Sequence, residues 1–169
     1  MKTRIGNLIQ MANSSQIDVL VHGCNCFHLM GAGIAKQVAY YFPIAEIQDK
    51  KTRYGDPLKV GTYSHCLQLN NTGKWLTVVN AYTQYHIGPD ARLKAIESSF
   101  SLIGQHFGHL RIGYPKIGCG IGGLDWKEVE PIIEYALKGL DHTLVVLPTV
   151  VTAHLFGIQK LRSILDDTE

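Results

Sequence analysis

Residues 111 to 126 read RIGYPKIGCGIGGLDW. A short apolar run ends at Pro115, and four glycines then stand between positions 118 and 123. Asp125, with Glu128 three residues later, is typical of the first turn of a helix. A strand, a glycine-rich loop and a helix in this order indicate a βα unit. Such a loop can bring backbone N–H groups close to a phosphate, because glycine has no Cβ.

A second unit of the same kind lies near the N-terminus. Residues 17 to 22 (IDVLVH) contain a short apolar run that is rich in β-branched residues, which predicts a buried strand. The loop Gly31-Ala32-Gly33 follows, and residues 33 to 42 have helical spacing of apolar side chains before Pro43. Two loops of this type at strand ends predict a diphosphate site. Either loop alone could equally be a tight turn that closes its βα unit.

The remaining segments complete a layered α/β pattern. Residues 63–69 and 75–81 are rich in strand formers, and the five residues between them predict an antiparallel hairpin. Asp90 is the expected N-cap of a helix with one apolar stripe. The members of the stripe are Leu93, Ile96, Phe100, Ile103 and Phe107. With strands at 111–115 and 143–147, we expect a three-layer α/β/α fold with a mixed, mostly parallel central sheet. We expect one domain over residues 1–169.

Composition narrows the class of protein. The chain has 169 residues, 46% of them hydrophobic, and a formal net charge of +2 with scattered charges. No basic stripe is present, so we predict no groove binding of duplex nucleic acid. The N-terminal residues lack the apolar core of a signal peptide, and no stretch approaches roughly 20 apolar residues. Four cysteines in a domain of this size indicate reduced thiols. We therefore expect a cytoplasmic monomer with no membrane partner.

Two common nucleotide-binding motifs fit poorly. Gly118, Gly120 and Gly123 satisfy the spacing G-x-G-x-x-G of NAD-dependent oxidoreductases. That fingerprint requires an acidic residue about 20 positions later, where this chain has residues 147–149, LPT. The sequence also lacks the P-loop pattern G-x-x-x-x-G-K-[ST]. A nucleotide would have to be bound in another way.

Histidines and cysteines offer two further kinds of chemistry. Four of them alternate along one segment: His22, Cys24, Cys26 and His28. Alternate residues of a strand stand roughly 6.6 Å apart, too far for all four to reach one zinc ion unless a tight loop gathers them. A cysteine nucleophile is possible at Cys24, Cys26 or Cys119, although a cysteine beside glycines is more often a small buried hydrophobe.

Three segments together resemble the macro domain family. They are residues 22–26 (HGCNC), residues 30–36 (MGAGIAK) and residues 115–126 (PKIGCGIGGLDW). The resemblance extends from Gly6 to the last predicted strand. It is strongest to the branch of ADP-ribose-1''-phosphate phosphatases and ADP-ribosyl hydrolases.

The resemblance implies a ligand and its contacts. ADP-ribose would lie across the strand ends, with its diphosphate between the two glycine loops and its distal ribose beside Asn25. The residues expected to bind the ligand are Asn7, Leu8, Gly31, Ala32, Gly33, Ile34, Lys116, Gly118, Cys119, Gly120, Ile121 and Gly122. Asn7 stands where the family usually has an aspartate that accepts from the adenine amino group, although Gly-Asn is also a good turn pair.

The resemblance also implies catalysis, with two departures from the family pattern. Some hydrolases of the branch carry a lysine in the segment that corresponds to residues 80–86, and none is present here. Some carry an acid where this chain has Gly122. The catalytic candidates are Asn25, His22, Asp125 and His86. We expect a hydrolase that acts on ADP-ribose-1''-phosphate or on ester-type or nucleic-acid-linked ADP-ribose, without metal or cofactor. The alternative is a non-catalytic reader of ADP-ribose.

Overall fold

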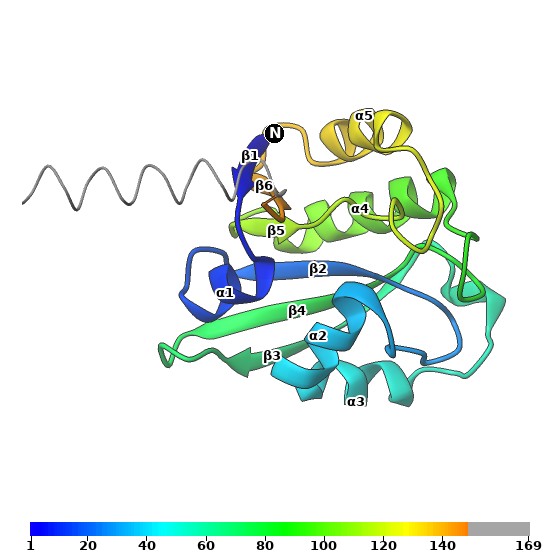
Figure 1. Ribbon diagram of the computed structural model, residues 1–169, viewed down its shortest axis with the longest axis horizontal. Coiled ribbons are helices and arrows are strands. Elements are labelled where there is room, and N and C mark those ends of the chain that lie inside the picture. Colours follow the sequence, from blue (N-terminus) through cyan, green and yellow to red (C-terminus); the bar gives the residue numbers. More distant parts are fainter. Residues whose placement is uncertain (149–169) are drawn as a thin grey trace, which may run out of the picture.

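A computed structural model describes residues 1–148 and shows one six-stranded sheet (Figure 1). The strand order is β1-β6-β5-β2-β4-β3, and all neighbours are parallel except the hairpin pair β3 and β4. The strands are β1 Lys2–Ile5, β2 Val19–Cys24, β3 Tyr63–Leu69, β4 Trp75–Tyr82, β5 Ile112–Tyr114 and β6 His142–Val146. The predicted mixed, mostly parallel sheet and its hairpin are confirmed.

Helices cover both faces of the sheet. They are α1 Leu8–Asn13, α2 Gly33–Tyr41, α3 Pro43–Lys51, α4 Leu93–Phe107 and α5 Trp126–Ala136, with a short 3₁₀ helix at Pro57–Lys59. Helices α4 and α5 lie on one face, and α1, α2 and α3 lie on the other (Figure 1). The three-layer α/β/α architecture is therefore confirmed.

Strand β2 shows why the sheet lies between two cores. Val19 and Val21 pack toward α4 and α5, whereas Leu20 packs toward α1 and α2. Because successive side chains of a strand point to opposite faces, a strand buried on both sides needs a continuous apolar run. The stripe of α4 faces the first core, where Ile96, Phe100 and Ile103 are fully buried.

Two local predictions are wrong and one is confirmed. Asp90 does not cap α4, whose N-cap is Arg92 without a side-chain bond. The Asp90 carboxylate instead accepts from the backbone N–H groups of Tyr85 and His86, at 3.0 and 2.9 Å, and closes the loop after β4. Strand β2 begins two residues later than predicted and continues to Cys24, because β4 pairs with it to the end. Asp125 does cap α5, accepting from Lys127 N at 3.0 Å.

Two further findings concern membrane-spanning helices and metal-binding groups in residues 1–148. None of its helices is long and apolar enough to cross a membrane. Residues 1–148 contain no group of three or more side chains that could hold a metal ion. The predicted domain runs to residue 169, beyond the described residues, so its extent stays a prediction.

Candidate functional site

A cavity of about 240 Å³ opens where β2, β4 and β5 end. Three segments line it: residues between 23 and 35, residues between 83 and 87, and residues between 115 and 122. The first and third contain the two predicted glycine loops. Sequence segments almost a hundred residues apart therefore form one site.

The first glycine loop leads directly into α2. Gly33, Ile34 and Ala35 form the first turn of this nine-residue helix, and all three line the cavity. The N-cap, Ala32, has no side-chain oxygen to accept from their N–H groups. These N–H groups and the positive end of the helix dipole are therefore free to meet a negatively charged group.

The second glycine loop folds back on itself. Leu124 N donates to the carbonyl of Gly118 at 3.0 Å, and Gly123 N donates to that of Gly120 at 3.2 Å. A Cβ at Gly120 would meet no atom within 4 Å, so packing does not require glycine there. Across the cavity, the Cδ1 atom of Ile121 lies 3.9 Å from the position of a Cβ on Gly33. The two loops thus face each other at short range.

Asn25 lies in the cavity wall with 5% of its surface exposed. Its side-chain oxygen accepts from Phe27 N at 2.9 Å, and its Nδ2 donates to the Leu29 carbonyl at 2.8 Å. These bonds close the loop after β2 and fix the amide. One N–H of the amide remains for a ligand.

His22 is fully buried and does not line the cavity. Its Nε2 donates to the amide oxygen of Asn80 at 2.8 Å. Burial lowers the pKa of His22 to about 4. The imidazole is therefore neutral near pH 7, and it lies on the α3 side of the sheet, since Asn80 in turn donates to the Ala45 carbonyl.

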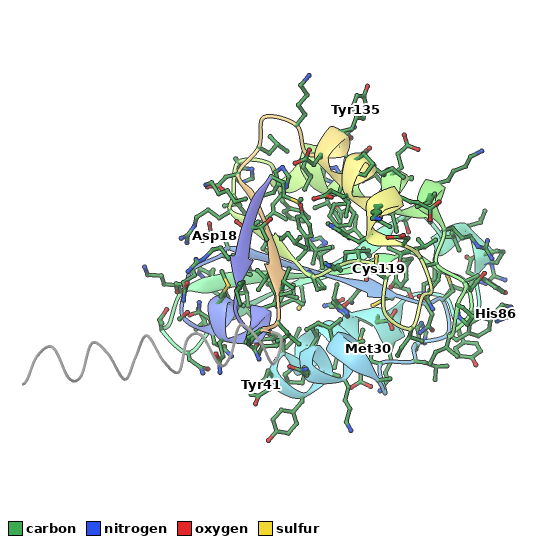
Figure 2. All side chains as sticks on the ribbon, turned by 45° about the horizontal axis from the view of Figure 1, so that its top comes forward. Asp18, Met30, Tyr41, His86, Cys119 and Tyr135 are labelled. Carbon is green, nitrogen blue, oxygen red and sulfur yellow. The ribbon has the colours of Figure 1, made fainter. Side chains whose placement is uncertain are left out.

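The other two catalytic candidates also lie outside the cavity lining. Asp125 is exposed, and its carboxylate is occupied by the cap of α5. His86 is exposed on the loop after β4, stacked on Phe27 with ring centres 5.1 Å apart. Figure 2 shows His86 at the edge of the molecule, well away from Cys119 of the second glycine loop. The structure therefore brings Asn25 alone of the four candidates into the cavity.

The cysteines lack the features of a nucleophile. Burial raises the pKa of the Cys24, Cys26 and Cys119 thiols. The thiol of Cys119 donates to the Ile117 carbonyl at 3.2 Å. Because the thiolate is the reactive form, these groups are poorly suited to attack a substrate.

Four residues expected to bind the ligand do not line the cavity. Asn7 caps α1, its side-chain oxygen accepting from Ile9 N and Gln10 N, and it borders a separate groove beside α1 and α2. Leu8 is buried in the core. Gly31 and Cys119 flank the lining residues of their loops. The remaining eight expected contacts line the cavity: Ala32, Gly33, Ile34, Lys116, Gly118, Gly120, Ile121 and Gly122.

None of the residues in the third wall of the cavity was among the predicted site residues, although the resemblance had drawn attention to the segment 80–86. This wall consists of Thr83, Gln84 and Ile87, in the loop that follows β4. The signal that could have found it is topological, because β4 is the parallel neighbour of β2 and both end at the same edge.

Opposed glycine loops at the carboxyl ends of parallel strands define a binding site for an anionic, nucleotide-like ligand in an α/β protein. The family model described as "Macro domain" matches residues 21–133. The chain belongs to the macro domain family.

Three relatives support this assignment. An uncharacterized 17.5 kDa protein of Enterobacteria phage T4 is 35% identical over 132 residues, which cover 75% of this chain and 84% of that protein. A DNA ADP-ribosyl transferase–DNA ADP-ribosyl glycohydrolase fusion protein of Thermosipho africanus is 29% identical, covering 70% of this chain and 35% of that protein. An ADP-ribose 1''-phosphate phosphatase of Saccharomyces cerevisiae is 27% identical, covering 76% and 88%.

Solved structures show the same fold. Thermosipho africanus DarTG in complex with ADP-ribose superimposes with a TM-score of 0.65 at 20% identity. The match covers 88% of this chain and 42% of that protein.

Proposed function

We propose that this protein binds ADP-ribose in the cavity and hydrolyses an ADP-ribose derivative. The substrate would be ADP-ribose-1''-phosphate or ADP-ribose joined through its distal ribose to an ester or a nucleic acid. One observation carries the proposal. The first turn of α2 and the loop at Gly120 face each other across one cavity, and both can offer backbone N–H groups to a ligand.

The charges around the cavity agree with a diphosphate ligand. Lys116 is the one charged residue among the described residues that line the cavity, and it is exposed at the rim. Most of the attraction for an anion would therefore come from backbone N–H groups and the helix dipole. This arrangement suits a diphosphate, which can accept from both loops at once.

The reaction would depend mainly on positioning. With the diphosphate held between Gly33 and Gly120, the distal ribose extends toward Asn25 and the loop after β4. When the sugar and the attacking water are both held in place, their reaction becomes effectively unimolecular, and this can supply a large share of the rate enhancement. His22 has no place in this step, because it is fully buried and does not line the cavity. Two relatives support a hydrolytic reaction: the ADP-ribose 1''-phosphate phosphatase and the DNA ADP-ribosyl transferase–DNA ADP-ribosyl glycohydrolase fusion protein.

One observation favours a second function, a reader that binds ADP-ribose without turnover. The described lining contains no carboxylate or histidine, and Gln84 stands in the segment where some hydrolases of the family carry a lysine. A water in this cavity would have to be activated by neutral groups or by the substrate itself.

Turnover separates the two functions. The protein is incubated with ADP-ribose-1''-phosphate, with glutamate-linked ADP-ribose and with DNA-linked ADP-ribose, and released phosphate or ADP-ribose is measured. Release from one substrate, abolished in the Gly120→Glu variant, supports the hydrolase and locates it in this cavity. Tight binding of all three without release supports the reader.

A further inference from the structure

Strand β3 lies at one edge of the sheet, and β4 is its one neighbour among the described residues (Figure 1). At the hairpin turn, Asn70 N donates to the Lys74 carbonyl at 2.9 Å. At the other end of the pair, Tyr82 N donates to the Thr62 carbonyl, also at 2.9 Å. Because the hydrogen-bonded residues of an antiparallel pair alternate, the even-numbered residues of β3 bond to β4. The backbone N–H and C=O groups of the odd-numbered residues therefore point away from β4, toward the open side of the strand.

This edge lacks the features that usually keep edge strands from pairing. Soluble proteins commonly protect an edge with charged side chains, proline, a bulge or a very short strand. Strand β3 has seven residues, YSHCLQL, with no Lys, Arg, Asp, Glu or Pro, and its register with β4 is unbroken. The opposite edge is protected, because β1 has four residues and two of them are Lys2 and Arg4. Strand β3 is therefore open to a further strand.

Three exposed apolar side chains lie beside this open edge. Leu67, Leu69 and Trp75 are exposed by 55, 56 and 63%. Leu69 pairs directly with Trp75, and Leu67 is two residues from Leu69, so all three lie on one face of the sheet. Helix α4 covers this face as far as Phe107, whose ring centre lies 5.4 Å from that of His65. The three side chains stand beyond the end of the helix, which leaves them uncovered.

We propose that β3 pairs with β3 of a second copy of this chain, antiparallel and about a two-fold axis at Leu67. In this register Leu67 lies opposite its own counterpart, and His65 lies opposite Leu69 in both directions. The odd-numbered residues then form about six backbone hydrogen bonds between the copies. A second copy brings an uncharged strand of equal length, with apolar side chains on the matching face, so that no like charges of β3 meet. The inference goes beyond the proposed function, because neither β3 nor Trp75 lines the cavity.

The size of the contact predicts a weak dimer. The exposed parts of the three apolar side chains amount to roughly 350 Å² per copy. With the backbone edges and the flanking side chains, the pair buries on the order of 1,000 Å², at the low end of specific interfaces. We expect a dissociation constant of about 10 μM. The chain is then a monomer when dilute and a dimer when concentrated, in contrast to the monomer expected from the sequence.

Sedimentation equilibrium between about 1 and about 500 μM tests the proposal on both sides of the expected dissociation constant. We expect the wild type to pass from monomer to dimer over this range. Leu67→Lys places two like charges opposite each other at the axis and removes an apolar contact from both copies. It should raise the dissociation constant at least about a hundredfold. The matched control is Tyr135→Lys, which adds the same charge at a side chain that is 77% exposed on α5, far from β3 (Figure 1), and should dimerise as the wild type does.

Hydrogen exchange separates strand pairing from a contact elsewhere on the surface. The N–H groups of His65, Leu67 and Leu69 point to the open side of β3. We expect them to exchange about tenfold more slowly at the highest protein concentration than at the lowest, because pairing gives them acceptors.

Each outcome bears on the dimer separately from the proposed function. A wild type that is monomeric at every concentration overturns the β3 pairing, and so does a dimer that Leu67→Lys leaves intact or that Tyr135→Lys weakens equally. A dimer without slower exchange at the three amides is formed by another surface and also overturns it. Leu67→Lys should bind ADP-ribose as the wild type does. A wild type that forms the dimer and binds no ADP-ribose would overturn the proposed function alone.

Discussion

Gly120→Glu is the sharpest perturbation of the proposed diphosphate site. Gly120 lines the cavity, and a side chain there would meet no protein atom within 4 Å. Its φ angle is outside the left-handed region, so a larger residue causes no backbone strain. Gly33 is less suitable for this test, because its φ of +56° would strain any other residue. The variant at position 120 should therefore fold normally and change the cavity alone.

The expected loss follows from charge repulsion. The facing loops approach closely, since Ile121 reaches within 3.9 Å of the Cβ position on Gly33. A glutamate carboxylate beside a diphosphate between these loops would lie roughly 6 Å from the phosphate charges. At an effective dielectric constant of about 40, each pair of unit charges then repels by about 1.4 kcal/mol. Two phosphate charges give about 3 kcal/mol, a loss of affinity of roughly a hundredfold.

Calorimetry with ADP-ribose measures this loss directly. Gly120→Gln is the matched control, because glutamine has the bulk of glutamate without its charge. We expect both variants to weaken binding, and the glutamate variant to be weaker than the glutamine variant by most of the charge effect. High salt should narrow the gap between them. A folded Gly120→Glu protein that binds ADP-ribose within threefold of the wild type would refute the placement of the diphosphate at this loop.

Three further predictions follow from the other residues. Asn25→Ala should lower kcat at least tenfold, and more than it weakens binding of ADP-ribose, because the amide orients the distal ribose at which the reaction takes place. Steady-state kinetics measure the loss in kcat, and calorimetry measures the loss in affinity. Equal losses in the two quantities would indicate a plain binding contact. The free energy of unfolding should fall by about 3 kcal/mol as the pH drops from about 6.5 to about 4. The pKa of His22 is about 4 in the folded protein and 6.5 when the side chain is exposed. In this pH range the unfolded chain therefore binds a proton that the folded protein does not, which favours unfolding. Urea unfolding at several pH values tests this, and His22→Gln should show a shallower dependence; an equal dependence in both proteins would contradict it. Asn7→Asp should keep the cap of α1 and leave the ADP-ribose affinity unchanged, because Asn7 borders a groove separate from the cavity and its side-chain oxygen already accepts from Ile9 N and Gln10 N. Calorimetry tests this, and a several-fold gain for ADP-ribose with none for ribose-5-phosphate, which lacks adenine, would instead show that position 7 is the adenine acceptor.

The parts of the fold that the sequence predicted are those with a local signal. The stripe of α4 repeats at helical spacing, and the hairpin at residues 63–82 is marked by its turn residues. Asp90 was assigned wrongly because an acidic residue before a helix can bond either to that helix or to the preceding loop. In this protein the loop N–H groups of Tyr85 and His86 lie closer. Helix α3 was not predicted, although its first residue, Pro43, is well suited to that position.

The candidate site was predicted where it is local and missed where it depends on tertiary contacts. Both glycine loops are visible as strand–loop–helix patterns. The wall that contains Thr83 is not, because it reaches the cavity through the pairing of β2 with β4, which are far apart in sequence. The choice of His22 and His86 as acid or base groups rested on residue type. Burial of the first and exposure of the second are properties of the fold, which residue type does not reveal.

Some glycines of the second loop are required by the fold, and one is not. At Gly122 a Cβ would stand 2.7 Å from the Cβ of Ala91, and Gly118 has a φ of +73°, so the fold itself requires glycine at both positions. Gly120 has neither constraint, yet it lines the cavity. Tight turns that merely close a βα unit would account for Gly118 and Gly122 and leave Gly120 free to be any residue. Glycine at a position that packing leaves open, facing the first turn of α2, is instead the arrangement expected where a ligand approaches the backbone closely.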